Sequence, residues 1–273
     1  MPAPRTVLLT GAAGGMGTLL RERLPHHGYA LRLFDRAPVE GEPGAITADL
    51  ADRDALSKAV RGVDAIVHLA GIPLESDFET ILEANIRGTY HLYEAARTEG
   101  VRRIVLASSN HAVGFTPRPS GSPVPGDALI PADTPHRPDT FYGLSKCFGE
   151  DLASFYWDRH GLETVSLRIG ACCPVPTSVR MLSIWLSPDD CARLVHSALT
   201  KEGVGHTVVH GSSANTRLVW DLSGARALGY EPRDDSEVHA AALIEEQGDL
   251  RPGDPDHDRL GGHFCTDPPI WPH

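Results

Sequence analysis

The chain has 273 residues and a formal net charge of −11, with 41% hydrophobic and 22% charged residues. These values are ordinary for a globular protein, and the length suits one large α/β domain or a nucleotide-binding domain with a small appendage. The acidic balance disfavours binding to nucleic acid or to anionic lipid, so we expect neither partner. An anionic substrate would need a local cation to hold it.

The cysteines and the lack of a long apolar run indicate where the protein works. The five cysteines are an odd number and include no CxxC pair, which is typical of a reducing compartment. No apolar run approaches the ~20 residues of a membrane span, and the first expected strand follows the start without a signal segment. The sequence therefore predicts a cytoplasmic protein.

Strands and helices alternate along most of the chain. Short runs of β-forming residues predict seven strands, at residues 5–10, 31–35, 45–47, 64–69, 103–107, 164–169 and 207–209. Helical patterns separate them, at residues 15–24, 52–60, 76–97, 140–160 and 188–199. This alternation favours right-handed βαβ units around a doubly wound parallel sheet, a Rossmann-type α/β fold. We expect one domain over residues 1–273, in which residues 171–187 and 210–273 form a small substrate-binding lobe.

Residues 116–138 interrupt this alternation. The segment carries seven prolines and no hydrophobic period, which predicts a long loop. Such a loop often covers an active site, and the plainer alternative is an insertion on the surface. The helix that follows should present Phe148, Leu152 and Phe155 as its apolar face and should end at Gly161.

A glycine-rich turn, TGAAGGMG at residues 10–17, joins the first strand to the first helix. Glycines allow a tight turn and bring backbone N–H groups close to a pyrophosphate, and the helix N-terminus adds a positive dipole end. Alone this pattern is weak, but here it has the required strand–turn–helix context. It predicts a dinucleotide site that includes Gly11, Gly14, Gly15, Met16 and Gly17.

Asp35 ends the second strand, 18 residues after Gly17. Its carboxylate can accept hydrogen bonds from the adenosine ribose and would repel a 2′-phosphate, which favours NAD over NADP. The neighbouring Arg36 leaves the use of both cofactors open. Asp49 and Leu50 are placed to meet the adenine, although Asp49 could instead cap the next helix. The other expected cofactor contacts are Leu69, Ala70, Gly71, Ile169 and Cys172.

Tyr142 and Lys146 are four residues apart in a predicted helix, so their side chains share a face. We expect the ammonium to lower the pKa of the phenol, so that Tyr142 acts as a base toward a substrate hydroxyl. Ser109 follows the fifth strand and can bind the same oxygen, although a serine there is more often part of a turn. The three residues form a candidate catalytic set, and Tyr142 and Lys146 also contact the cofactor.

These motifs resemble the extended branch of the short-chain dehydrogenase/reductase family. The resemblance rests on the glycine turn, Asp35, HLAG at residues 68–71 and YGLSK at residues 142–146. Four further strings are similar to those of uronate dehydrogenases over nearly the whole chain: SSNH at 108–111, RIG at 168–170, RMLS at 180–183 and GGHF at 261–264.

The resemblance implies that NAD oxidises galacturonate or glucuronate at the C1 lactol, giving an aldarolactone. It also implies that Asn110 and His111 bind sugar hydroxyls, that Arg180 binds the C6 carboxylate, and that Phe264 borders the pocket. The chemistry agrees, because arginine is a planar, bidentate donor for a carboxylate. Arg180 could alternatively pair with a surface carboxylate.

Two positions depart from what the resemblance implies. Pro73 and Ala171 stand where we expect serines that touch the substrate. A hydrogen bond is worth roughly 0.5–1.5 kcal/mol, so their loss should weaken binding or shift the preferred epimer.

Two other functions compete with this one. The first is an NAD-dependent sugar or nucleotide-sugar epimerase or dehydratase of the same branch, although about 100 residues after the sixth strand are few for holding a nucleotide. The second is a non-catalytic NAD sensor, which has no use for the intact Ser109, Tyr142 and Lys146. We predict no metal ion, a small uronic acid as substrate, and self-association into a homo-oligomer.

Overall fold

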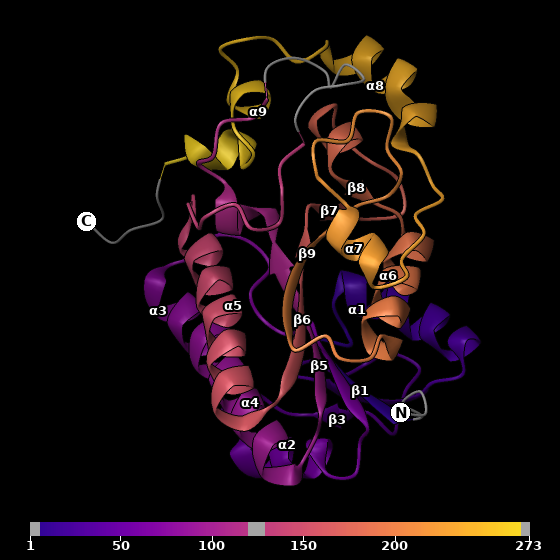
Figure 1. Ribbon diagram of the computed structural model, residues 1–273, viewed down its shortest axis with the longest axis vertical. Helices are drawn as coiled ribbons and strands as arrows, with labels where there is room; N and C mark the ends of the chain where they lie inside the picture. Colours follow the sequence, from indigo (N-terminus) through magenta and orange to yellow (C-terminus); the bar gives the residue numbers. More distant parts are fainter. Residues whose placement is uncertain (1–5, 120–128, 269–273) are drawn as a thin grey trace.

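The computed structural model describes residues 6–119 and 129–268 (Figure 1). Residue 5 of the first expected strand, residues 120–128 of the expected loop and residues 269–273 of the expected lobe lie outside the described residues. Within the described ranges, no helix is long and apolar enough to span a membrane.

A seven-stranded parallel sheet forms the centre of the molecule, in the order β3-β2-β1-β4-β5-β6-β9. Its strands are β1 (Thr6–Thr10), β2 (Ala30–Asp35), β3 (Ile46–Thr47), β4 (Ala65–His68), β5 (Arg103–Ser109), β6 (Glu163–Ile169) and β9 (His206–Gly211). The chain order reverses between β1 and β4, and ligands of such sheets bind beside the carboxyl ends at this point. The expected Rossmann-type fold and all seven strands are confirmed.

Helices cover both faces of the sheet (Figure 1). One face packs on α1 (Gly15–Arg23) and α6 (Pro188–Thr200), and the other on α2 (Arg53–Val60), α4 (Gly88–Glu99) and α5 (Phe141–His160). Each layer has its own apolar cluster, which includes Leu20 and Leu194 on the first face and Leu56 and Leu92 on the second. The remaining helices are α3 (Phe78–Ile81), α7 (Ser223–Ala227), α8 (Ala240–Gln247) and α9 (Pro255–Asp258).

The ends of α5 follow from its sequence. The Thr140 side chain accepts a hydrogen bond from the Gly143 N–H, and the Glu75 carboxylate accepts from the N–H groups of Phe141 and Tyr142. These contacts satisfy donors that have no partner within the helix, and a carboxylate also complements the helix dipole. Gly161 closes the helix in the left-handed region, at φ +67°, as expected.

Two expectations about the helices are wrong in detail. The helix expected at residues 76–97 is interrupted by a π-helical segment, Leu82–Arg87, between α3 and α4. The buried side of α5 is made of small residues together with Glu150 and Tyr156. Leu152 packs against the same core as expected, but Phe155 is 54% exposed. Large side chains do not fit where α5 crosses the sheet closely, because a Cβ on Gly149 would lie 3.3 Å from Leu106.

The segments expected to form a lobe contain small apolar clusters of their own. One includes Ile184, Trp220 and Leu260, and the other includes Leu182 and Leu243. A short parallel pair, β7 (Ala171–Cys172) and β8 (Trp185–Leu186), was not expected from the sequence. In Figure 1 this part, with α8 and α9, lies above the carboxyl edge of the sheet.

Candidate active site

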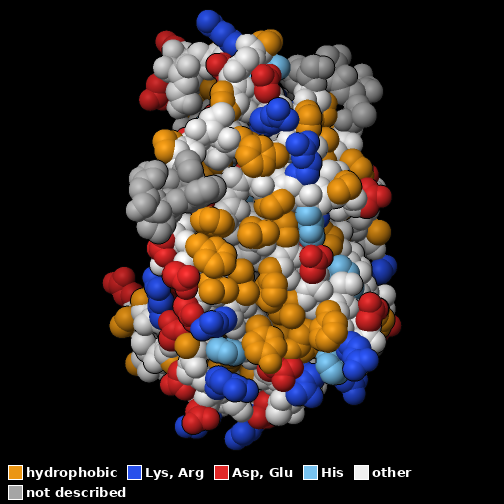
Figure 2. Space-filling view, turned by 90° about the vertical axis from the view of Figure 1, so that its left-hand side faces the viewer, with side chains coloured by type: hydrophobic (Ala, Val, Ile, Leu, Met, Phe, Trp, Pro, Cys, Tyr) orange, Lys and Arg blue, Asp and Glu red, His pale blue; other side chains and the backbone are white. Residues whose placement is uncertain are grey.

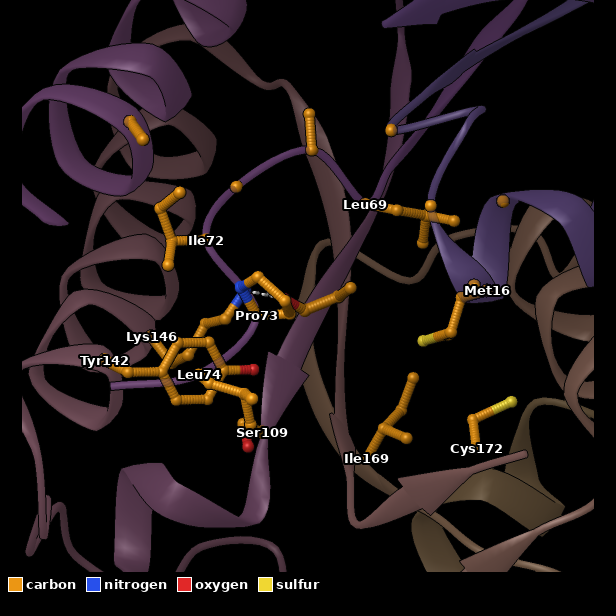
Figure 3. A pocket seen from close by; sticks show the side chains of 18 of the residues that line it. Met16, Leu69, Ile72, Pro73, Leu74, Ser109, Tyr142, Lys146, Ile169 and Cys172 are labelled. Atoms are coloured by element: carbon orange, nitrogen blue, oxygen red, sulfur yellow. Dashed lines mark hydrogen bonds between the residues drawn. The ribbon is translucent and has the colours of Figure 1, made fainter. Parts of the chain in front are cut away.

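A pocket of about 620 Å³ lies at the carboxyl edge of the sheet. Figure 3 shows two opposed walls, with Met16, Leu69, Ile169 and Cys172 on one side and Tyr142, Lys146 and Ser109 on the other. Of the site residues named from the sequence, only Asn110 is missing from the lining. The lining also contains residues that the sequence did not single out, among them Ile72, Leu74, Ala107, Cys173 and Met181.

The glycine turn brings the backbone close together at the start of α1. A Cβ on Gly17 would lie 2.1 Å from the Gly11 carbonyl oxygen, and Gly11 itself has φ +71°. Any side chain at Gly17 would therefore displace the turn. Gly14, Gly15, Met16 and Gly17 at the N-terminus of α1 line the pocket, which suits a pyrophosphate.

Asp35 lies at the pocket wall with its carboxylate held by the turn. Oδ2 accepts from the Ala13 N–H at 2.9 Å and Oδ1 from the Ala37 N–H at 2.8 Å. Each carboxylate oxygen can accept a second hydrogen bond, so the group can still receive ribose hydroxyls. Arg36 also lines the pocket.

Asp49 also lines the pocket, and the idea that it caps the next helix is wrong. Asp52 is the N-cap of α2 and accepts from the Ala55 N–H, whereas Asp49 accepts from the Ala51 N–H within the preceding turn.

Ser109, Tyr142 and Lys146 come together on one wall. The Tyr142 phenol lies beside the Ser109 side chain (Figure 3), and their interaction lowers the pKa of the phenol. Lys146 Nζ donates to the Ala107 carbonyl oxygen at 2.8 Å and lies 5.2 Å from the centroid of the Tyr142 ring. The set can therefore move a proton at the phenol oxygen while Ser109 binds the same substrate oxygen.

The pKa values in this set differ from the sequence-based expectation. Burial raises the pKa of Tyr142 to about 12, although the interaction with Ser109 acts in the opposite direction. Burial also lowers the pKa of Lys146 to about 8. The expected lowering of the tyrosine pKa by Lys146 is wrong for this arrangement, because loss of hydration disfavours the phenolate more than its neighbours favour it.

The candidate sugar-binding residues lie around the opposite end of this set. Arg180 Nη2 donates to the Leu260 carbonyl oxygen at 2.8 Å, and its Nε lies 3.7 Å from Asp256 Oδ1. The His111 ring lies 4.5 Å from the Phe264 ring and 5.9 Å from the Tyr142 ring, measured between centroids. His111, Arg180 and Phe264 thus share one pocket with the tyrosine.

Asn110 is placed differently. Its side chain is buried, and Nδ2 donates to the Leu260 carbonyl oxygen at 3.2 Å. This contact, like that of Arg180, joins the pocket to the C-terminal segment. Pro73 and Ala171 both line the pocket, so the missing serine hydroxyls would have faced a ligand.

Several residues that organise the site carried no recognisable sequence signal. Asp139 contacts His111, Asp256 contacts Arg180, and Glu75 holds the first turn of α5. They are single carboxylates at irregular spacing, and only the fold brings them to their partners. Asn85, by contrast, fits the extended short-chain dehydrogenase branch in sequence and was expected to have a structural role. It lies in the π-helical segment and bonds both backbone groups of Ile72, and so fixes the pocket wall.

Residues 7–173 match the model of the NAD dependent epimerase/dehydratase family, and the chain belongs to that family. Over nearly its whole length it is similar to uronate dehydrogenases. The enzyme of Pseudomonas putida is 49% identical, and the match covers 97% of each chain. These findings confirm the resemblance seen in the motifs.

Solved structures agree with this placement. Uronate dehydrogenase from Agrobacterium tumefaciens is 42% identical, with a TM-score of 0.89 over 98% of this chain and 99% of that one. Glucuronic acid dehydrogenase from Chromohalobacter salexigens is 41% identical, with a TM-score of 0.90 over 98% of each chain. A mutant of the Agrobacterium enzyme was solved as a complex with NAD.

Proposed function

We propose that the protein oxidises a hexuronate, galacturonate or glucuronate, at its C1 lactol to the aldarolactone, with NAD as the hydride acceptor. The observation that carries this is Arg180, a buried guanidinium that shares one pocket with Tyr142 and Ser109. The contact of Arg180 with Asp256 is long, at 3.7 Å, which leaves the guanidinium able to bind a substrate carboxylate. The uronate dehydrogenases at 42–49% identity support the same substrate class.

We assign the cofactor to the wall built by the glycine turn, Asp35, Asp49, Leu50 and residues 69–71. NAD would supply the two-electron acceptor of the reaction. The pyrophosphate suits the N-terminus of α1, and Asp35 suits a ribose that carries no 2′-phosphate. Ile169, Cys172 and Met16 supply the apolar part of the pocket, on the wall opposite Tyr142 (Figure 3).

Tyr142 takes the proton of the C1 hydroxyl as its phenolate, while the C1 hydrogen leaves as hydride. Ser109 donates to the same substrate oxygen, and Lys146 provides a positive charge beside the tyrosine. NAD bound in this pocket would add a positive charge, which would favour the Tyr142 phenolate and oppose the rise in its pKa that burial causes. Arg180 binds the C6 carboxylate and orients C1, while His111 and Asn110 bind or support the sugar hydroxyls.

The experiment that tests this function measures NADH absorbance with a panel of hexuronates and neutral aldoses. We expect turnover with at least one hexuronate and much weaker turnover with the matching aldose. An epimerase or dehydratase of the same family would retain NAD through purification and would convert a nucleotide sugar without net NADH. A sensor would bind NAD and turn over nothing.

We further propose that the protein works in the cytoplasm as a homo-oligomer, and that the C-terminal segments act as the substrate-binding part. Large apolar side chains are exposed along α3, α4 and α5, including Phe78, Tyr90, Leu144 and Phe155. Figure 2 shows a broad apolar area on this side of the molecule. Such an area favours an interface between copies, which light scattering of wild type and Phe155→Glu would test.

A further inference from the structure

The chain packs closely around one buried carboxylate, Asp139, which precedes α5. Its side chain is fully buried and lies against three glycines from three separate segments. A Cβ on Gly114 or on Gly261 would lie 1.9 Å from Asp139 Oδ2, and a Cβ on Gly143 would lie 3.0 Å from Oδ1. Burying a charged carboxylate costs free energy unless the carboxylate is hydrogen-bonded. We therefore expect Asp139 to have hydrogen-bond partners.

The carboxylate is directed at a pocket residue. Asp139 Oδ2 lies 2.7 Å from His111 Nδ1, and Oδ1 accepts from the Thr140 hydroxyl at 3.0 Å. An ionised carboxylate can only accept, so the proton between the two groups belongs to Nδ1. In a neutral ring, Nε2 then carries a lone pair. Because His111 lines the pocket, Nε2 is the nitrogen left for a ligand.

We propose that Asp139 is a positioning residue that holds His111 as the Nδ1–H tautomer, so that His111 Nε2 accepts a hydrogen bond from a substrate hydroxyl. That this hydroxyl belongs to a sugar acid rests on the proposed function. The tautomer of the His111 ring does not depend on it. Such a histidine requires a substrate that carries a hydroxyl group opposite His111 Nε2.

The surroundings of the ring support a fixed orientation. Phe264 and Tyr142 contact the imidazole from two other elements, at 4.5 Å and 5.9 Å between centroids. The backbone N–H of His111 also donates to Ser109 Oγ at 3.2 Å. The Ser109 hydroxyl itself donates to Asn110 Oδ1 at 3.5 Å. The ring of His111 is thus held by Asp139 and its backbone N–H by Ser109.

Asp139 also acts on other titratable groups, and these interactions must be distinguished from its effect on His111. The groups are Tyr142 on α5, Arg180 on the segment Arg180–Ser183, and Cys265 on the segment Gly262–Cys265. The negative charge of Asp139 raises the pKa of Tyr142, so removing it also moves the pH profile of kcat to lower pH. The effects through His111 and through Arg180 both fall on KM, and the double-mutant cycle with His111→Ala separates them.

The first test is the tautomer of His111, measured by ¹⁵N NMR on the whole enzyme labelled in histidine. The chain has 14 histidines, so the His111 signals are assigned by their loss in His111→Gln. We expect a protonated Nδ1 and an unprotonated Nε2 in wild type. A ring with the proton on Nε2, or protonated on both nitrogens, overturns the proposal. This test needs no substrate and no variant at Asp139.

The second test is a double-mutant cycle on KM for the preferred hexuronate. Asp139→Asn should raise KM roughly 10-fold in wild type, because a buried hydrogen bond is lost. In a His111→Ala background the same change should add less than about 2-fold, since the two residues act as one unit. An equal effect in both backgrounds indicates a structural role and overturns the proposal.

The matched control is Asp190→Asn. Asp190 is also fully buried and accepts backbone N–H bonds from Arg233 and Asp234, but it does not line the pocket. It should lower Tm and leave KM unchanged.

Deoxyfluoro analogues of the hexuronate probe the same contact from the substrate side, because fluorine keeps the size of a hydroxyl but cannot donate. Wild type should discriminate against one such analogue by roughly 10-fold, and His111→Ala should not. Equal discrimination in both enzymes overturns the proposal. If wild type oxidises no hexuronate at all, the proposed function fails, while the NMR result still decides the state of His111.

Discussion

Lys146 places its ammonium 5.2 Å from the centroid of the Tyr142 ring and gives a hydrogen bond to the Ala107 carbonyl oxygen. The contact fixes the two side chains together, yet the phenol keeps a pKa raised to about 12 by burial. The lysine alone thus does not make the tyrosine a base at neutral pH. We infer that the positive charge of the cofactor completes the environment in which the phenolate forms.

The pH dependence of turnover follows from this arrangement. Only the phenolate accepts a proton, so kcat for oxidation should rise as pH increases through the neutral and alkaline range. Tyr142→Phe should lower kcat by at least about 100-fold at every pH, because it removes the proton acceptor. NAD binding, measured by calorimetry, should stay within a few-fold of wild type. Tyr90→Phe, at an exposed tyrosine outside the pocket, is the control.

Arg180 should distinguish acid sugars from neutral ones. Arg180→Lys keeps the charge but loses the planar pair of donors, and we expect KM for hexuronates to rise roughly 10- to 100-fold. The much weaker turnover of neutral aldoses should change little, since they offer no carboxylate. Steady-state kinetics with both substrate classes checks this. A parallel loss for aldoses would mean that Arg180 supports the fold instead of the carboxylate.

Gly262 gives an independent test of the same contact. It has φ +65°, and a Cβ there would lie 2.5 Å from Arg180 Nε and 2.1 Å from Asp256 Oδ1. Gly262→Ala should therefore displace the guanidinium and raise KM for hexuronates without changing KM for NAD. Gly253→Ala is the matched control, because it also has positive φ, at +98°, but has open space around it. Similar kinetics in the two variants would contradict the assignment.

Asp35 should set the choice of cofactor. Asp35→Asn removes the negative charge beside the expected adenosine ribose, and Arg36 already lies in the pocket wall. We expect the ratio of kcat/KM for NADP to that for NAD to rise roughly 10- to 100-fold. Asp49→Asn, also in the pocket wall, should change this ratio far less. An unchanged ratio in Asp35→Asn would place the ribose elsewhere.

The buried pair Glu150–Arg168 should dominate acid stability. Burial would raise the pKa of Glu150, but hydrogen bonds from His136 and Arg168 lower it to about 2. The unfolded chain therefore takes up this proton at higher pH than the folded one, and the stabilisation is lost as pH falls from about 4.5 toward 2.

Glu150→Gln should cost roughly 3–5 kcal/mol near neutral pH, because Arg168 is left buried and unpaired. Chemical denaturation at several pH values measures both effects. Glu83→Gln breaks an exposed pair with Arg87 and should cost at most about 1 kcal/mol. Equal losses of unfolding free energy in the two variants would show that burial of an ion pair does not determine its contribution to stability.

The sequence was sufficient for the sheet and for the pocket wall that we assign to the dinucleotide. Those features rest on local patterns, such as glycines at 11, 14 and 17 and an aspartate at a strand end. Residues close together in the sequence determine them. The capping of α5 by Thr140 and its end at Gly161 are of the same local kind.

The sequence did not predict contacts that depend on segments far apart in the chain. The position of Phe155 on α5 was misjudged because the side chain is apolar, yet the fold leaves it 54% exposed and buries its neighbour Tyr156 instead. The tyrosine pKa was misjudged because a sequence shows the nearby lysine but not the loss of water around the phenol. Asp139 and Asp256 gave no signal, since nothing local marks which carboxylate meets His111 or Arg180.

The segment around Leu260 reaches back from the far end of the chain to the pocket, where its carbonyl oxygen accepts from both Asn110 and Arg180. During synthesis, the residues of the two parts of the site therefore leave the ribosome at different times. The cofactor contacts that we assign end at Cys172, whereas the proposed sugar-binding part also needs the later segment around Leu260. A chain truncated before Leu260 should still bind the dinucleotide, but it should not bind the substrate, because Asn110 and Arg180 lose their shared carbonyl contact.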